Sequence, residues 1–168
     1  MFQWVERSEP VADAIGRALL AFSDLEARLA SANSFLLFRG PSGGDEGRIL
    51  GWFIGYSQKV SLFDKLVRYR LKDRTPSERL NELVRSLRSA GSMRNRLIHT
   101  EWMETGRPDI VESIRLITET DPYREEWLKL VTGGDIAPTR QIFVSAGQAI
   151  TRFLVDFDRP LRGLPAEA

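Results

Sequence analysis

Apolar residues recur every three or four positions in four stretches of the chain, and this period constrains the fold more than any other feature. A spacing of three or four residues places side chains on one face of an α-helix. Amphipathic helices of this length bury their apolar faces against one another. The sequence therefore predicts an all-α fold, a bundle of about four main helices with short extra elements. The first stretch has the apolar positions Val11, Ile15, Ala18, Leu19, Phe22, Leu25, Leu29 and Ala32.

Capping signals place the start of the first helix, whereas Gly51 and Gly55 leave the start of the second helical region open. Ser8-Glu9-Pro10 opens the first helix, because serine caps the N-terminus, glutamate suits the positive end of the dipole and proline is tolerated in the first turn. This helix covers roughly 25 residues and can continue to Phe38. The second helical region covers Leu50 to Arg70.

The third helix has a clear start, and a proline marks the predicted start of the last helix. Thr75-Pro76-Ser77-Glu78 is a capping box, and the helix that it opens is expected to end at about His99, with Gly91 as a weak point. The last helix is predicted to begin at Pro138 and to carry apolar residues as far as Phe157.

The connections are less regular. Residues 39–48 hold four glycines and a proline, which is typical of a loop. Within residues 100–122, Ile110 to Ile117 alternates loosely and fits either a short strand or an irregular excursion. Tyr123 to Leu130 is predicted to be a short amphipathic helix that Gly133-Gly134 ends. One domain, 1–158, is expected, followed by a loose tail, 159–168.

Composition excludes several classes of site. The chain of 168 residues has no cysteine and one histidine, His99. Disulfides, thiol nucleophiles, cysteine-ligated zinc and sites with two histidines from one chain are excluded, whereas an all-carboxylate magnesium or calcium site is not. No cofactor and no metal is expected. No apolar run approaches 18 residues and no signal-peptide layout begins the chain, so we expect a soluble cytoplasmic protein with no membrane partner.

Positive charge is concentrated in one segment. The whole chain has a formal net charge of +1, yet Lys65 to His99 contains ten basic and three acidic side chains. Such asymmetry indicates a polyanion partner, such as RNA. The alternative is that these charges only form a solvated helix face.

The chemistry-bearing residues gather at the end of the third helix. Asn95 and His99 lie four residues apart, so they share a helix face. Arg88 and Ser92 lie near the same face, whereas Arg94 falls on the apolar stripe, seven residues after Leu87. Burying an unpaired guanidinium is costly. Arg94 therefore either extends to solvent at the edge of the stripe, pairs with a carboxylate, or lines a cleft or an interface.

This group of residues suits the cleavage of RNA by its own 2′-hydroxyl. Histidine transfers protons near neutral pH, so His99 could act as base or acid, and Arg94 could hold the phosphate. Asn95 could orient the imidazole or a phosphate oxygen. One histidine cannot easily make both proton transfers, so we expect an isologous dimer around the third helix that brings two histidines and two arginines to one cleft. A structural His99, favoured by the helix dipole, is the alternative.

The run Arg94-Asn95-Arg96-Leu97-Ile98-His99 resembles the Arg-x(4–6)-His signature of the HEPN superfamily (higher eukaryotes and prokaryotes nucleotide-binding domains). Members often begin the motif with Arg-Asn and place an apolar residue before the histidine, as here. The resemblance implies an all-α bundle with the motif at the end of an inner helix. It also implies a dimeric, metal-independent endoribonuclease, often a toxin or a defence component with an antitoxin partner, in which Arg94, Asn95 and His99 are the catalytic residues.

Further residues could line such a site. Some relatives carry an acidic residue in the first helix that faces the site, and Glu26 could match it; a salt bridge or a solvated face is the alternative. Glu101 and Trp102 could flank a cleft or simply pack. Not every member of the family cleaves RNA, so a non-catalytic HEPN-like module that binds RNA, a nucleotide or a protein remains open, as does an unrelated helical interaction protein.

Overall fold

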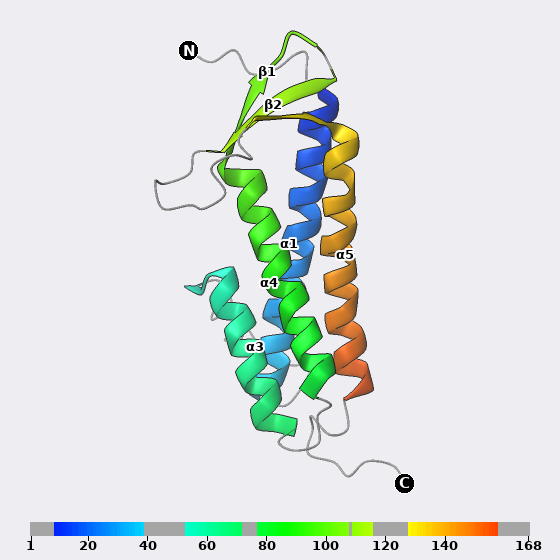
Figure 1. The fold of residues 1–168 in the computed structure, drawn as a ribbon. Helices are drawn as coiled ribbons and strands as arrows, with labels where there is room; N and C mark the ends of the chain where they lie inside the picture. Colours follow the sequence, from blue (N-terminus) through cyan, green and yellow to red (C-terminus); the bar gives the residue numbers. More distant parts are fainter. Residues whose placement is uncertain (1–8, 39–52, 72–76, 108, 116–127, 158–168) are drawn as a thin grey trace.

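The computed structural model describes residues 9–38, 53–71, 77–107, 109–115 and 128–157. Within these residues the chain is an all-α bundle with a small sheet at one end, which confirms the predicted fold class (Figure 1). The helices are α1 (Glu9–Phe38), α3 (Tyr56–Leu71), α4 (Ser77–His99) and α5 (Gly133–Asp156), and the strands are β1 (Thr100–Glu104), β2 (Ile110–Arg115) and β3 (Leu128–Thr132).

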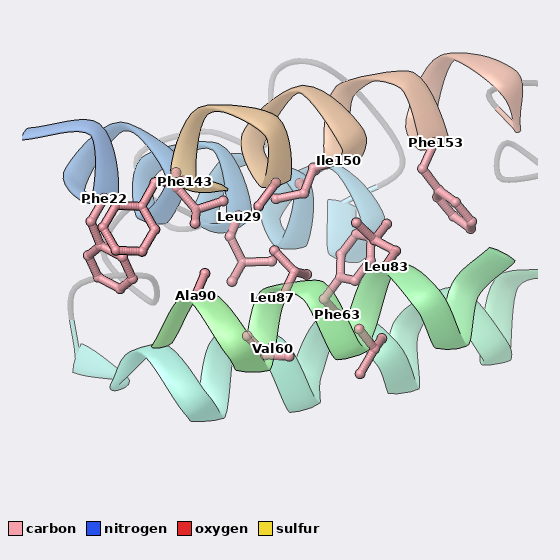
Figure 2. Close-up of a cluster of buried hydrophobic side chains, with 14 of the residues drawn as sticks. Phe22, Leu29, Val60, Phe63, Leu83, Leu87, Ala90, Phe143, Ile150 and Phe153 are labelled. Atoms are coloured by element: carbon pink, nitrogen blue, oxygen red, sulfur yellow. The ribbon is translucent and has the colours of Figure 1, made fainter. Parts of the chain in front are cut away.

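The helices pack lengthwise around one apolar core. α1 and α5 both begin beside the sheet and run away from it, whereas α4 runs back towards it (Figure 1). Phenylalanine rings from three of the helices meet edge to face (Figure 2). The centre of the Phe22 ring lies 5.2 Å from that of Phe143, and the centre of the Phe63 ring lies 6.2 Å from that of Phe153. Such tilted pairs add to the free energy gained by burying the rings. The predicted apolar stripes are therefore the faces that form the core.

Gly91 lies inside α4, and its missing side chain makes room for α3. A Cβ at this position would lie 2.9 Å from two ring carbons of Tyr56, the first residue of α3. That ring cannot easily move, because it packs 4.7 Å from Phe22 and its hydroxyl donates a 2.9 Å hydrogen bond to the carbonyl of Leu87. The glycine that weakens the helix locally is therefore what lets two helices approach closely.

Gly91→Ala is expected to destabilise the protein by about 1–3 kcal/mol through overpacking, despite the better helix propensity of alanine. Gly16→Ala is the matched control, because Gly16 also lies inside a helix but has open space where a Cβ would be. The control should stabilise the fold by up to about 1 kcal/mol. Urea unfolding of both variants checks the signs; a stabilising Gly91→Ala would mean that the Tyr56 ring moves aside.

The sheet closes the end of the bundle where α4 ends. Its three antiparallel strands lie in the order β1-β2-β3. Val111 of β2 is buried and Trp102 of β1 is half-buried, so one face of the sheet packs on the helices. On the other face Met103, Glu112 and Leu130 are register neighbours across the three strands. Of the two alternatives for Ile110 to Ile117, the structure has a strand over Ile110–Arg115.

The start of α5 corrects two boundaries. Gly133-Gly134 does not end a helix but opens one, and α5 begins five residues before Pro138. The reason is a capping box: Thr132 accepts a hydrogen bond from the backbone of Asp135, whose carboxylate accepts one from the backbone of Thr132. The backbone N–H and the hydroxyl of Thr132 both donate to this carboxylate, and these two hydrogen bonds hold the pKa of Asp135 below its usual value. Leu128–Leu130, expected at the end of a helix, belongs to β3.

Other predicted ends agree with the structure. α1 reaches Phe38 and α4 ends at His99. The predictions that lie outside the described residues are Ser8 at the start of the first helix, the loop at 39–48, residues 50–52 of the second helical region, the Thr75-Pro76 part of the capping box, residues 116–117 of the alternating stretch, residues 123–127 of the short helix, and the tail at 159–168.

Candidate functional site

The predicted motif lies in the last two turns of α4, where the helix passes directly into β1. The final carbonyl groups of a helix have no partner within it. Here the hydroxyl of Thr100 donates to the carbonyl of Arg96, and the indole nitrogen of Trp102 donates to that of Leu97 at 3.3 Å. The first strand residues therefore cap the helix that carries the motif, and Trp102 packs against the core instead of standing free.

Arg94 is half-buried on the apolar stripe, and the structure shows how its charge is accommodated. Its guanidinium carbon lies 5.8 Å from the centre of the Phe22 ring, a cation–π contact. Its Nη1 donates a 3.1 Å hydrogen bond to Oδ1 of Asn95. The carboxylate pair considered for Arg94 does not occur within the described residues; its partners there are an aromatic ring and an amide.

His99 lies apart from Arg94 around the helix. Five residues correspond to a rotation of about 140° about the helix axis, whereas Asn95 and His99 differ by only about 40°. Asn95, His99, Arg88 and Ser92 are all exposed, as one helix face requires. The structure therefore brings Arg94 to Asn95 and leaves His99 on the solvent-facing side of the helix with Asn95.

Glu26 forms an ion pair, the alternative considered from the sequence. Its Oε1 accepts a 2.5 Å hydrogen bond from Nζ of Lys59, whose residue is 6% exposed. The side chain of Glu26 is 33% exposed. Asn33 donates a 2.9 Å bond to the carbonyl of Lys59, and its own Oδ1 has no partner in the described part of the chain. Glu26 thus holds a buried lysine between α1 and α3.

Glu26 is also distant from His99 along the bundle. Glu26 lies one helical turn after Phe22 on α1, and the centre of the Phe22 ring lies 4.7 Å from that of the Tyr56 ring. Tyr56 in turn packs at Gly91, eight residues before His99 on α4. Eight residues of helix span about 12 Å. The described geometry therefore places Glu26 at the level of the middle of α4. The side chain of Glu101 lies outside the described part.

Glu26, Lys59 and Tyr56 form a polar cluster. The sequence pointed to Glu26 as a candidate residue but not to Lys59 or Tyr56. One signal was present: Lys59 lies four residues before Phe63, on the apolar side of its helix. A lysine at such a position needs a carboxylate partner or a route to water. The sequence could flag Lys59, but it could not show which acid would meet it.

Burial raises the pKa of Tyr56 well above its usual value, and the charge of Glu26 raises it further. An unfolded tyrosine ionises near pH 10, so above that pH the unfolded chain binds fewer protons than the folded one and stability falls. Tyr56→Phe should cost about 1 kcal/mol at pH 7 by losing the bond to Leu87. The deficit should shrink between pH 10 and 11 in urea unfolding; a constant deficit would contradict the raised pKa.

A groove of about 790 Å³ lies elsewhere, between α1 and α5. None of the predicted site residues lines it, and its walls include Ala27, Phe35 and Leu154. In the described ranges no three Asp, Glu or His side chains lie close enough together to hold a metal ion. No helix of the described residues is long and apolar enough to cross a bilayer.

Comparisons with known proteins add no relative. No protein-family model matches the chain, and no curated protein and no solved structure shows significant similarity to it. The function must therefore be argued from the residues themselves.

Proposed function

We propose that this chain is a metal-independent endoribonuclease of the HEPN type that acts as a homodimer. The observation that carries the proposal is the exposed His99 one turn beyond an Asn95 that is hydrogen-bonded to Arg94. An imidazole open to solvent can reach a substrate, and an asparagine on the same face can orient it or a phosphate oxygen.

The reaction needs no group that the chain lacks. A base removes the proton of the 2′-hydroxyl, the 2′-oxygen bonds to the adjacent phosphorus, and the bond to the 5′-oxygen breaks. An acid protonates the departing 5′-oxygen, and a cation balances the charge of the transition state. The products are a 2′,3′-cyclic phosphate and a 5′-hydroxyl. In the proposed dimer, His99 of one protomer removes the proton of the 2′-hydroxyl and the partner's His99 protonates the departing 5′-oxygen, while the Arg94 guanidinium supplies the positive charge.

The geometry of one protomer supports the proposal of a dimer. Arg94 and His99 lie about 140° apart around α4, so one protomer does not present both to the same phosphate easily. A two-fold axis beside the end of α4 would place the His99 and Arg94 of both copies around one cleft. The proposal extends to a toxin or defence role in the cytoplasm, with an antitoxin protein as second partner, on the strength of the motif.

A second candidate function is RNA binding without cleavage. The contacts of Arg94 with Phe22 and Asn95 favour it, because a guanidinium that already has partners is less free to follow a phosphate.

The two functions are separated by a cleavage assay in EDTA. Purified protein is incubated with a panel of single-stranded and transfer RNAs, and the ends of the products are determined. Cleavage with cyclic phosphate ends is the expected result, with a dimer in light scattering. A strict magnesium requirement, or 5′-phosphate ends, would contradict the proposed mechanism; binding without cleavage would favour the second function.

A further inference from the structure

Three arginines, Arg85, Arg88 and Arg96, form an exposed strip on α4 that we call the arginine face. With 100° of rotation per residue they lie within about 80° of one another around the helix axis. His99 and Asn95 fall on the same side of the helix, within about 40° of Arg88. The arginine face thus extends along α4 as far as the proposed catalytic histidine.

These three arginines have no carboxylate partner among the described residues, unlike several arginines elsewhere in the structure. Elsewhere arginines pair with aspartates, commonly four residues earlier on the same helix, as in Asp13–Arg17, Asp24–Arg28 and Asp64–Arg68. On α4 the residue four places before Arg88 is Val84 and that before Arg96 is Ser92. Their charges are therefore not neutralised by their own helix.

The surrounding sequence keeps the face positive. Between Glu82 and Glu101 there is no acidic residue, although the interval holds four arginines and His99. Glu82 lies three residues before Arg85, yet the two exposed side chains form no ion pair with each other in the described part of the chain. The small polar side chains of Ser89 and Ser92 stand beside the arginines and offer further hydrogen bonds to phosphate oxygens. An unneutralised row of arginines is the charge pattern that complements a phosphodiester chain.

The face suits a single strand better than a duplex. From Arg88 to His99 the helix rises about 16 Å, enough for several consecutive phosphates. Attack by a 2′-hydroxyl in line with the leaving oxygen needs a flexible backbone, which single strands have.

We propose that the arginine face binds the phosphate backbone of single-stranded RNA and leads it to His99. The direction of the strand towards His99 rests on the proposed nuclease function, whereas the binding of RNA to the face does not. Arg85 and Arg88 would each contact a phosphate, and Arg96 would hold the strand beside the histidine.

The test measures binding and cleavage separately. Fluorescence anisotropy with a single-stranded RNA that carries 2′-O-methyl groups reports binding, because this RNA has no 2′-hydroxyl to attack. The double variant Arg85→Gln/Arg88→Gln is compared with wild type and with Lys65→Gln/Arg140→Gln. The second pair removes the same charge from exposed positions on α3 and α5.

We expect the arginine-face variant to bind about tenfold or more weakly and to lower the slope of log affinity against log salt by about 1.4, two phosphate contacts. The control pair should lose less than about threefold through the change in net charge. Equal losses in both variants, or no binding by wild type, would overturn the proposal. Binding of duplex RNA or of polyglutamate to the same arginines, as tight as that of the single-stranded RNA, would also overturn the proposal.

The same proteins separate the two proposals. If the arginine-face variant binds as wild type does and His99 still governs cleavage, the inference fails and the nuclease stands. If binding falls but wild type cleaves none of the unmodified RNAs, the face binds RNA and the proposed nuclease function fails.

Discussion

His99→Ala is expected to lower RNA cleavage by about 10²–10⁴-fold, the usual contribution of a general acid or base. The unfolding free energy should change by less than about 0.5 kcal/mol, because His99 is exposed and no hydrogen bond or ion pair of its side chain appears within the described residues. Loss of activity without loss of stability separates a catalytic role from a structural one.

Two further variants sharpen this result. Arg94→Lys keeps the charge but loses the planar fork, so it should retain stability better than Arg94→Ala and still cleave slowly. Ser145→Ala changes an exposed residue on α5 and is the control for the effects of mutation and purification. It should cleave RNA as wild type does. Initial rates in EDTA, with circular dichroism and light scattering on each protein, provide the measurements. Full activity of His99→Ala would show that another group transfers the proton.

Removal of the Glu26 carboxylate is the second large effect. Glu26→Ala leaves the ammonium group of Lys59 buried without its partner, and breaking a buried pair in this way costs about 3–5 kcal/mol. Because a third of the Glu26 side chain is exposed, water can reach part of the site, and we expect about 2–4 kcal/mol. Urea unfolding at pH 7 measures the loss.

The chain contains a matched control two residues away. Asp24 also forms an ion pair, with Arg28 one turn later on α1, but the side chains of both residues are well exposed. Asp24→Ala should therefore cost less than about 1 kcal/mol. Adding Lys59→Met to Glu26→Ala should recover most of the stability, since no buried charge remains. Equal losses for Glu26→Ala and Asp24→Ala would mean that water solvates Lys59.

Sequence reasoning succeeded where the signal is local. The end of α4 at His99 and the shared face of Asn95 and His99 follow from helix geometry alone. It failed at Gly133-Gly134, where composition suggested a stop. Part of the cause is not local: a Cβ at Gly133 would lie 2.9 Å from the carbonyl oxygen of Pro10, so a glycine is needed where α1 and α5 begin side by side.

The site was predictable to a similar extent. The stripe position of Arg94 showed that its charge needed a partner, but Phe22 is 72 residues earlier and meets it only through the packing of α1 against α4. Lys59 and Glu26 meet for the same reason. Patterns within one helix predict which side chains share a face; the partners from another helix depend on how far the helices slide past one another, which no short-range pattern fixes.

The absence of a loop between α4 and β1 affects what binding at His99 costs. The last turn of a helix usually frays. Here fraying would also have to break the strand pairing of Thr100 with Arg115 and the hydrogen bond from the indole of Trp102 to the carbonyl of Leu97. Much of the backbone entropy at residue 99 is thus lost on folding, before any ligand arrives. A ligand that meets this histidine finds a preorganised backbone, and the free energy of its contacts goes into affinity instead of ordering.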